Sequence, residues 1–344
     1  MTIRGSAEFL DGLQSVRVIS AAAVEGTHGL NELANASEPL IIQGLIDTWP
    51  ALAAGARSFA SLCDYLQSLD RGLPAAVMET PASLHGRFGY QEDLRELTFS
   101  VRNVPLRDSL RRMLAAQGQN GGPVIAIQML PLAGHMPDFL RQNPMPLLPQ
   151  TEPRLWIGGA VRTQIHHDRD HNLACVIAGR RRFVLFPPEQ LKNLYIGPID
   201  NPPPLSLVDL EAPDFERFPR FQAALSSARV AHLEAGDALL MPRYWWHHVT
   251  SLDSVNAMIN YWWGAQKEGL CTPYDTFLAA LLAFKELPVA ERRYWQTMFD
   301  AHVFAPTNGA MEHVPVELRG VLGPLDSATR ASLVRKLKAA LLKP

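Results

Sequence analysis

Residues 163–198 read TQIHHDRDHNLACVIAGRRRFVLFPPEQLKNLYIGP, a stretch rich in strand-forming residues. Val, Ile, Phe and Thr recur in Arg162–His167, Leu173–Ile177 and Arg180–Phe186, and these residue types favour extended backbone. Ala178-Gly179 separates the last two segments, so we interpret them as the two strands of a hairpin. The centre of the chain is therefore predicted to be a β domain.

Similar segments continue on both sides of this stretch. The further predicted strands are Glu38–Leu45, Val124–Leu130, Arg154–Ile157, Val230–Leu233, Ala238–Met241, His247–Leu252 and Val255–Trp263. Helical patterns occur at 57–68 and 104–117 and, beyond the β region, at Tyr274–Phe284, Ala290–Val303 and Ser327–Leu342. Residues 7–35 are expected to be helical or irregular, and the Pro-rich, acidic residues 198–220 are expected to form a surface excursion. This order predicts a mainly β fold class with flanking helices.

The overall composition is that of an ordinary globular protein with room for one large domain and a smaller one. Of 344 residues, 47% are hydrophobic and 19% are charged, and the formal net charge of −2 argues against a broad basic surface for nucleic acid. The first residues, MTIRGSAEFLDGLQ, lack the apolar core of a signal peptide, and no apolar run approaches the ~20 residues of a membrane span. Cys63, Cys175 and Cys271 are odd in number and widely spaced, which indicates reduced thiols. We therefore expect a soluble, cytoplasmic protein.

A histidine and a carboxylate stand two residues apart at the end of the predicted strand Arg162–His167. Side chains alternate between the two faces of a strand, so His166 and Asp168 point the same way and His167 points the opposite way. A third ligand must come from elsewhere, and Trp245-Trp246-His247-His248 offers two candidates. Only one of these adjacent histidines can face inward, and alternation does not say which.

Two histidines and one carboxylate on one face of an octahedral metal leave three positions open, which suits non-haem Fe(II) oxygenases. Each element has an ordinary interpretation as well. A lone HxD triplet is most often a set of surface or packed residues, and a histidine after two tryptophans is equally consistent with a hydrogen-bonded core residue. Only the combination of the two segments favours a metal site.

Taken together, the segments resemble the JmjC-type, cupin-like (Cupin_8) hydroxylases, a family that includes the asparaginyl hydroxylase of hypoxia-inducible factor. The resemblance covers about residues 151–265, through TQIHHDRDHNLACVIAGRRRFVLFPPEQLKNLYIGP, APDFERFPRFQ, GDALLMPRYWWHHVTSL and INYWWG. EPLIIQGLIDTWP near the start resembles the entry segment of the same family. The sequence is also similar to a bacterial branch associated with TonB-dependent receptor systems.

The resemblance implies a particular architecture. We expect a double-stranded β-helix (jelly-roll) core at 151–265 with an N-terminal elaboration at 1–150, which together form a catalytic domain at 1–270. Residues 271–344 are expected to be a helical dimerisation segment, because related hydroxylases dimerise through such helices. Apolar stripes, Leu278, Leu281 and Leu282 and then Leu333, Leu337 and Leu341, are consistent with a homodimer.

The resemblance also implies the site residues. It selects His247 over His248, so that His166, Asp168 and His247 would hold Fe(II). The co-substrate 2-oxoglutarate would contact the hydroxyl of Thr163, the amides of Asn172 and Asn260, the indole of Trp262 and, where relatives commonly place a lysine, the guanidinium of Arg181.

Alternation supports the role of Arg181 independently. On the strand Arg180–Phe186, Arg181 shares its face with Phe183 and Leu185, while Arg180 and Arg182 are expected to face solvent. An arginine among apolar barrel residues needs an anion, and the distal carboxylate of 2-oxoglutarate is one candidate. The alternative is an ion pair with an acid such as Asp170 that only supports the fold.

The expected reaction is hydroxylation of an unactivated C–H bond with 2-oxoglutarate and O₂, with a protein or peptide side chain as the first choice of substrate. A tRNA or a small metabolite is the second choice. A non-oxidative, metal-binding cupin that acts as a ligand sensor or binding module is the competing hypothesis. It is kept because Val124–Gln128 lacks the tyrosine that helps anchor the co-substrate in the asparaginyl hydroxylase.

Overall fold

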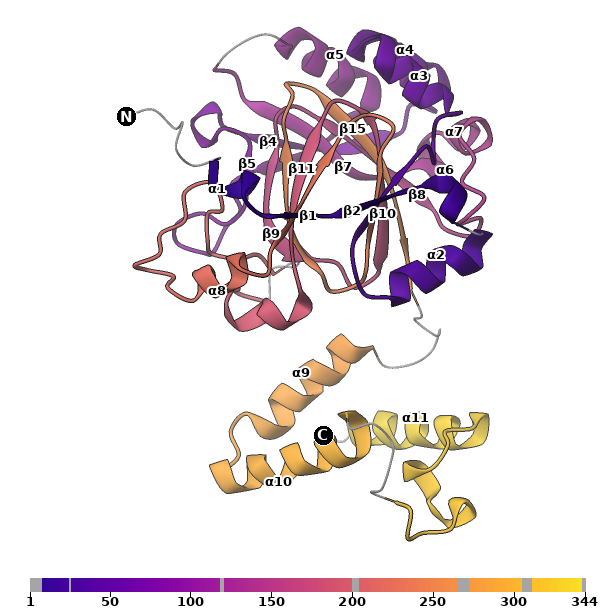
Figure 1. Ribbon diagram of the computed structural model, residues 1–344, viewed down its shortest axis with the longest axis vertical. Helices are drawn as coiled ribbons and strands as arrows, with labels where there is room; N and C mark the ends of the chain where they lie inside the picture. Colours follow the sequence, from indigo (N-terminus) through magenta and orange to yellow (C-terminus); the bar gives the residue numbers. More distant parts are fainter. Residues whose placement is uncertain are drawn as a thin grey trace. The chain divides into compact units, whose positions relative to one another are not determined.

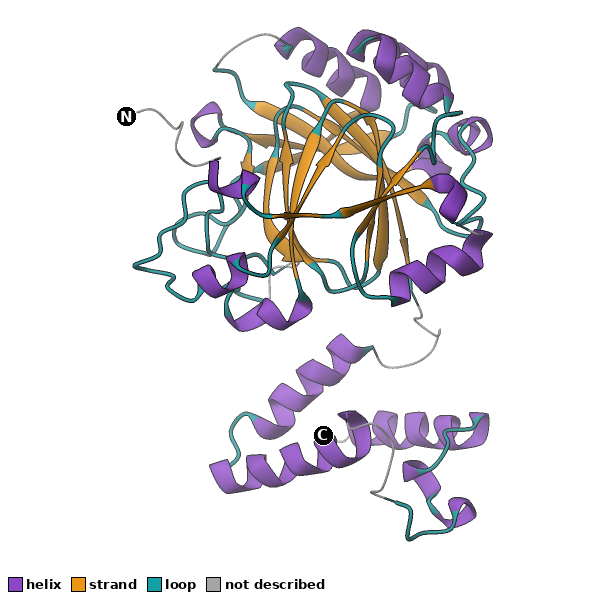
Figure 2. Ribbon diagram, viewed as in Figure 1, coloured by secondary structure: helices purple, strands orange, loops and turns teal. Residues whose placement is uncertain are grey.

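The computed structural model describes residues 8–24, 26–117, 121–199, 204–264, 272–304 and 311–341. The chain divides into two compact units, Met1–Gly264 and Ala265–Pro344. The first unit contains β-sheets surrounded by helices, and the second contains helices (Figure 1, Figure 2). The predicted boundary at 270/271 and Cys271 lie outside the described residues, whereas Cys63 and Cys175 are free and buried. Among the described helices, none is long and apolar enough to cross a membrane.

Two sheets form the centre of the first unit. Sheet A has the strand order β1 (Gln14–Ser15), β12 (Arg229–Leu233), β11 (Arg181–Phe186), β14 (Trp246–Ser251), β9 (Arg162–His167) and β5 (Arg87–Phe88). Sheet B has the order β2 (Arg17–Ser20), β3 (Leu40–Gln43), β13 (Ala238–Met241), β10 (His171–Ala178), β15 (Asn256–Trp263), β8 (Pro153–Gly158), β7 (Val124–Pro131), β4 (Pro74–Thr80) and β6 (Ser100–Pro105). Most neighbouring strands within each sheet are antiparallel.

The two sheets pack face to face around an apolar interior. Phe183 and Leu185 of sheet A share one buried cluster with Ala174, Leu239 and Met258 of sheet B. Alternation along each strand then assigns an inner face, which lines the barrel, and an outer face. The fold is a double-stranded β-helix of the cupin and JmjC type, as predicted.

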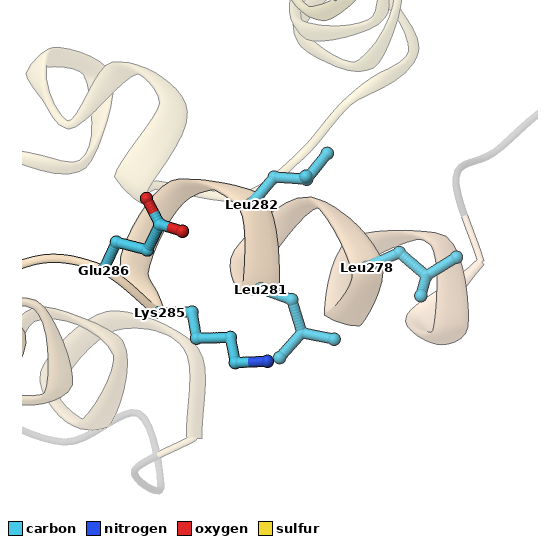
Figure 3. Close-up of a pocket in the computed structure, with 5 residues that line it drawn as sticks. All are labelled: Leu278, Leu281, Leu282, Lys285 and Glu286. Atoms are coloured by element: carbon cyan, nitrogen blue, oxygen red, sulfur yellow. The ribbon is translucent and has the colours of Figure 1, made fainter. Parts of the chain in front are cut away.

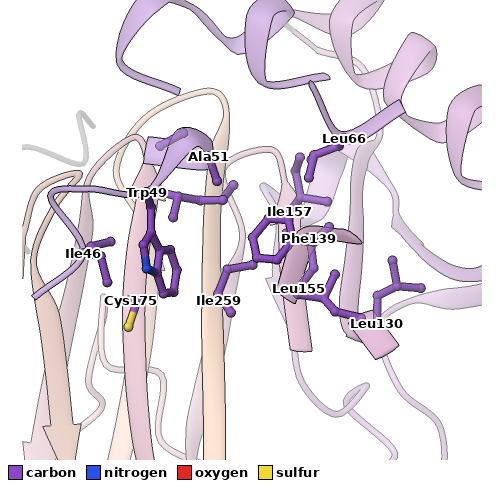
Figure 4. Packing of buried hydrophobic residues seen from close by; sticks show 14 of the residues in the cluster. Ile46, Trp49, Ala51, Leu66, Leu130, Phe139, Leu155, Ile157, Cys175 and Ile259 are labelled. Carbon is purple, nitrogen blue, oxygen red and sulfur yellow. The ribbon is translucent and has the colours of Figure 1, made fainter. Parts of the chain in front are cut away.

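Helices cover the outer face of sheet B. They are α2 (Gly26–Asn35), α3 (Pro50–Arg57), α4 (Phe59–Leu69), α5 (Leu106–Ala116), α6 (Leu132–His135) and α7 (Pro137–Gln142). Their apolar sides meet strand residues such as Leu155 and Ile259 in one large core, where Trp49 and Phe139 are fully buried (Figure 4). Two short helices, α1 (Glu8–Asp11) and α8 (Phe221–Leu225), belong to the side of sheet A.

The hairpin predicted at Ala178-Gly179 is wrong. β10 lies in sheet B and β11 lies in sheet A, so the short loop between them is a corner that changes sheets. Gly179 has φ +70°, and a Cβ there would lie 2.5 Å from the carbonyl oxygen of Val255, so only glycine fits. A two-residue loop between apolar strands gives the same local signal for a hairpin and for a corner.

The surface excursion predicted at 198–220 is wrong for residues 204–210, which are largely buried, whereas residues 212–217 are on the surface as predicted and residues 200–203 lie outside the described residues. We name residues 204–225 the covering segment, because its apolar side chains pack on the outer face of sheet A. Val208, Leu210 and Phe221 are fully buried there in one cluster with Val184 and Phe186. Prolines and acids mark the turns of this segment, while its alternate apolar residues cover the sheet.

The covering segment also corrects the expected exposure of Arg182. Arg182 is buried and its guanidinium lies 2.6 Å from the carboxylate of Glu211, which also accepts a hydrogen bond from the Thr250 hydroxyl at 3.2 Å. The side chains of Arg182 and Glu211 are only 8% and 18% exposed. Arg180 does reach solvent, where it pairs with Asp253.

Glu211→Ala is therefore expected to destabilise the protein by about 3 kcal/mol, because it leaves the Arg182 charge buried without a partner. Urea denaturation measures this loss. Arg141→Ala is the matched control, since it removes an ion pair with Asp138 that is largely exposed and should cost under about 1 kcal/mol. Equal losses in the free energy of unfolding would show that the buried ion pair contributes no more to stability than the exposed one.

The second unit is helical. It consists of α9 (Pro273–Phe284), α10 (Val289–Phe299) and α11 (Ser327–Leu341), with a π-helical turn at Asp300–Phe304. α9 begins at a capping box, in which Thr272 and Asp275 satisfy each other's backbone N–H groups. The three helices agree with the predicted ones. No described residue of this unit is buried, so the described helices do not enclose an apolar core.

Candidate metal centre

Three side chains that can ligate a metal meet on the inner wall of the barrel. His166 on β9 is in register with His247 on β14, and Asp168 follows the end of β9. The potential ligand atoms of the three residues all lie within 4.8 Å of one another, and His247 Nε2 is 3.8 Å from Asp168 Oδ2. The two imidazole centroids are 4.2 Å apart. The site therefore offers two nitrogens and one carboxylate to a single ion.

Backbone carbonyls fix the tautomer of both imidazoles. His166 Nδ1 lies 2.8 Å from the Gln164 carbonyl oxygen, and His247 Nδ1 lies 3.0 Å from that of Trp245. A carbonyl only accepts, so each Nδ1 carries the proton and each Nε2 presents its lone pair to the site. Burial, followed by the neighbouring His247, lowers the pKa of His166 to about 4, although Asp168 opposes the shift. His166 is thus held in the neutral form that ligates metals.

The two remaining histidines face away from the site. His167 packs edge to face on Trp246, with ring centroids 4.5 Å apart, on the outer side of sheet A. His248 is in register with Val184, whose side chain belongs to the outer cluster. The structure therefore places His247, and not His248, beside His166.

Asp168 is held by two donors that the sequence analysis assigned to the co-substrate pocket. Its Oδ2 accepts hydrogen bonds from Asn172 Nδ2 at 2.9 Å and from Trp262 Nε1 at 3.0 Å. Asn260 donates in turn to Asn172, at 3.5 Å, and accepts from the indole of Trp156 at 2.7 Å. This chain of hydrogen bonds runs along the inner face of sheet B and orients the carboxylate.

Trp262→Phe is expected to weaken metal binding about tenfold, because partners that orient a ligand typically contribute 10–100-fold to affinity. Anaerobic Fe(II) titration measures the change. Trp263→Phe is a matched control on the next residue, since the indole of Trp263 donates to Asn31 and not to Asp168. If both variants bound Fe(II) like the parent protein, the hydrogen bond to Asp168 would have no part in orienting it.

A bulge in β9 brings Thr163 to the inner wall. Thr163 and His166 are three positions apart in the sequence, so alternation alone would put them on opposite faces. Across the ladder, however, His247 pairs with His166 and Val249 pairs with Thr163, so β9 contains one extra residue. Gln164 and Ile165 both take the outer side, where Ile165 packs in the outer cluster and Gln164, with its amide suitably turned, donates to the Val208 carbonyl at 3.0 Å.

Arg181 lies on the inner wall and has no partner among the described residues. It is 7% exposed and in register with Ser251 and Leu233 on the neighbouring strands. Its Nε is buried without a hydrogen bond, and no described acid, Asp170 included, forms an ion pair with it. Burial alone lowers its pKa, to about 10. Leu185, four residues further along β11, pairs with His247, so Arg181 is about 13 Å of strand away from the metal ligands.

These residues fit the group that the sequence predicts. Two imidazoles that turn their Nε2 atoms toward the site and one carboxylate match Fe(II), and a buried guanidinium without a partner among the described residues matches the distal carboxylate of a bound acid. Trp156 and Arg154 were not predicted as site residues. They are two positions apart on β8, and both face the barrel interior. The predicted strand Arg154–Ile157 put them on one face, but the sequence contained no signal that this face was the inner one.

The fold belongs to one class of protein. Residues 27–269 match the Cupin-like domain family, Cupin_8, and the chain is a member of that family.

Several relatives share parts of the chain. Lysine-specific demethylase JMJ31 of Arabidopsis thaliana is 38% identical over 110 residues, which are 31% of this chain and 20% of the relative. HSPB1-associated protein 1 of Homo sapiens is 39% identical over 115 residues, 32% of this chain and 23% of the relative. Lysine-specific demethylase 8 of Danio rerio is 25% identical over 233 residues, 66% and 53% of the two chains. The matched region thus spans about a fifth to a half of these relatives.

Proposed function

We propose that this protein is an Fe(II)- and 2-oxoglutarate-dependent oxygenase that hydroxylates an unactivated C–H bond. The observation that carries the proposal is the grouping of His166, Asp168 and His247 within 4.8 Å on the inner wall. Such a set occupies one face of an octahedral ion and leaves positions for a bidentate co-substrate and O₂. The unpaired Arg181 on the same wall supports 2-oxoglutarate as the co-substrate.

Bound Fe(II) with 2-oxoglutarate and O₂ would supply the oxidising chemistry, in which the co-substrate is decarboxylated to succinate. The residues of the chain bind and orient. The two imidazoles and Asp168 would hold the ion, and the donors to Asp168 keep its carboxylate in one rotamer. Arg181 would bind the distal carboxylate with a hydrogen bond from Thr163, and the indoles of Trp156 and Trp262 restrict water at the inner wall.

We propose a protein or peptide side chain as the substrate. Relatives named as lysine-specific demethylases and as an HSPB1-associated protein support a protein substrate. A net charge of −2 makes tRNA a weaker choice, and a small metabolite is the remaining alternative. Closer kinship with the asparaginyl hydroxylase of hypoxia-inducible factor or with the TonB-associated branch, and a cytoplasmic location, stay predictions.

Turnover of the co-substrate tests this proposal. The protein is incubated in air with Fe(II), ascorbate and 2-oxoglutarate, with and without cell-derived peptides, and succinate is measured. An oxygenase forms succinate only with Fe(II), and a peptide substrate raises the rate. A non-oxidative cupin would bind the metal and form no succinate under any of these conditions.

We further propose that residues 271–344 join two copies of the chain, next to a catalytic domain at 1–270. Leu278, Leu281 and Leu282 line a surface groove of about 540 Å³ on α9 together with Lys285 and Glu286 (Figure 3). No described residue of this helical unit is buried, so we expect its apolar surface to be covered by a partner outside the unit. A second copy of the same unit fits, because apolar faces that cover each other are self-complementary in a twofold dimer.

Leu282→Asp is expected to convert a homodimer into monomers at micromolar concentration, because Leu282 is 87% exposed and a charge there cannot be buried against a partner. Light scattering coupled to gel filtration measures the mass. Val101→Asp, at a 53% exposed apolar residue of β6 in the first unit, should leave the dimer intact. A monomeric parent protein would contradict the proposal.

A further inference from the structure

We propose that Arg154 is a specificity-determining residue that binds a carboxylate of the substrate, an acidic side chain close to the residue that is hydroxylated. Arg154 lies on β8, in register with Asn260, and shares its inner face with Trp156. The inference rests on the proposed function, because it concerns the substrate of that same site.

The position of Arg154 places a cation beside the metal ligands. Its guanidinium carbon lies 5.6 Å from the ring centroid of Trp262, over the indole face. The N–H of that same indole donates to Asp168 at 3.0 Å. Arg154 is therefore separated from the ligand carboxylate by one aromatic ring, on the inner face of sheet B.

The charge of Arg154 is poorly compensated. Among the described residues it pairs only with Glu152, at 3.9 Å, and the two side chains are 30% and 43% exposed, so solvent screens the pair. Within the proposed site, the charges of Fe(II), Asp168, 2-oxoglutarate and Arg181 cancel. Arg154 is then a surplus cation beside the site, with its planar donors available to an incoming anion.

The same geometry disfavours a cationic substrate. A lysine or methyl-lysine side chain binds best over an aromatic face, and Arg154 already lies over one face of Trp262. A second cation there would be repelled by the guanidinium. Arg154 thus selects peptides with Asp or Glu near the reacting residue and disfavours lysine as that residue.

A charge-swap binding experiment tests the assignment. Two pools of random nonapeptides, one with Asp and Glu and the other with Lys and Arg at matched positions, are titrated against full-length protein loaded with Mn(II) and 2-oxoglutarate. Fluorescence anisotropy reports binding without turnover. We expect the parent protein to bind the acidic pool about tenfold more tightly than the basic pool. A difference in affinity of this size is what one partly exposed, charge-assisted contact contributes.

Variants at one position separate charge from packing. Arg154→Lys should keep the acidic preference, Arg154→Ala should lose it, and Arg154→Glu should reverse it in favour of the basic pool, while Arg141→Ala should behave like the parent. The inference is overturned if Arg154→Glu still prefers the acidic pool. It is also overturned if the parent protein binds the two pools equally or binds neither. A variant that weakens only 2-oxoglutarate binding overturns it as well. Because the readout is binding, its result decides the role of Arg154 whether or not succinate is formed.

Discussion

Replacing Asp168 with alanine is expected to lower Fe(II) affinity by more than about 100-fold and to abolish turnover. Asp168 is the only ligand with a negative charge, and the loss should exceed the 10–100-fold that residues supporting a ligand contribute. The substitution also leaves the Asn172 amide and the Trp262 indole without their acceptor. Anaerobic titration with Fe(II), followed by metal analysis after desalting, measures the change.

The neighbouring histidines give the controls for this prediction. His166→Ala and His247→Ala should also abolish turnover, because each removes an Nε2 from the site. His167→Ala and His248→Ala should retain the metal, since both side chains are on the outer side of sheet A. Normal metal content in His247→Ala, together with loss in His248→Ala, would contradict the assignment of the ligands.

Arg181→Met is expected to weaken 2-oxoglutarate binding by about two to three orders of magnitude and to leave Fe(II) binding nearly intact. A buried, charge-assisted contact of this kind is worth on the order of 2–5 kcal/mol. Without co-substrate the variant should be at least as stable as the parent, because replacing an unpaired buried charge with an apolar side chain of similar size removes a desolvation cost. Thermal denaturation with and without 2-oxoglutarate measures both effects.

Arg182→Met is the matched control on the next residue. It breaks the buried pair with Glu211, so it should lower the melting temperature while 2-oxoglutarate still stabilises the protein. The two adjacent arginines are thus expected to give opposite results. If Arg181→Met lowered the melting temperature and left co-substrate affinity unchanged, Arg181 would only support the fold.

The fold class could be predicted because the strands are local features of the sequence. Runs such as Leu173–Ile177 and Val255–Trp263 are apolar enough to be recognised alone, and the tail helices have a clear period. Which strands pair could not be predicted, since Ala178-Gly179 gives the same signal for a hairpin and for a corner between sheets. β6 was missed because it is largely exposed and lacks the apolar alternation of a core strand.

Only part of the candidate site could be predicted from the alternation of side chains along a strand. Alternation places His166 and Asp168 on one face, and the family resemblance selected His247. The bulge that brings Thr163 to the same wall depends on how β9 pairs with β14, so no local pattern shows it. The burial of Arg182 could not be predicted either, because its partner Glu211 lies in the covering segment, 29 residues further along the chain.

The most direct test of the proposed function is an anaerobic titration of the protein with Fe(II) and 2-oxoglutarate, followed by visible absorption. We expect a weak metal-to-ligand charge-transfer band that requires both Fe(II) and 2-oxoglutarate, is absent in Asp168→Ala and appears only at much higher 2-oxoglutarate in Arg181→Met. A protein that binds Fe(II) but develops no band at saturating 2-oxoglutarate would contradict the proposed function.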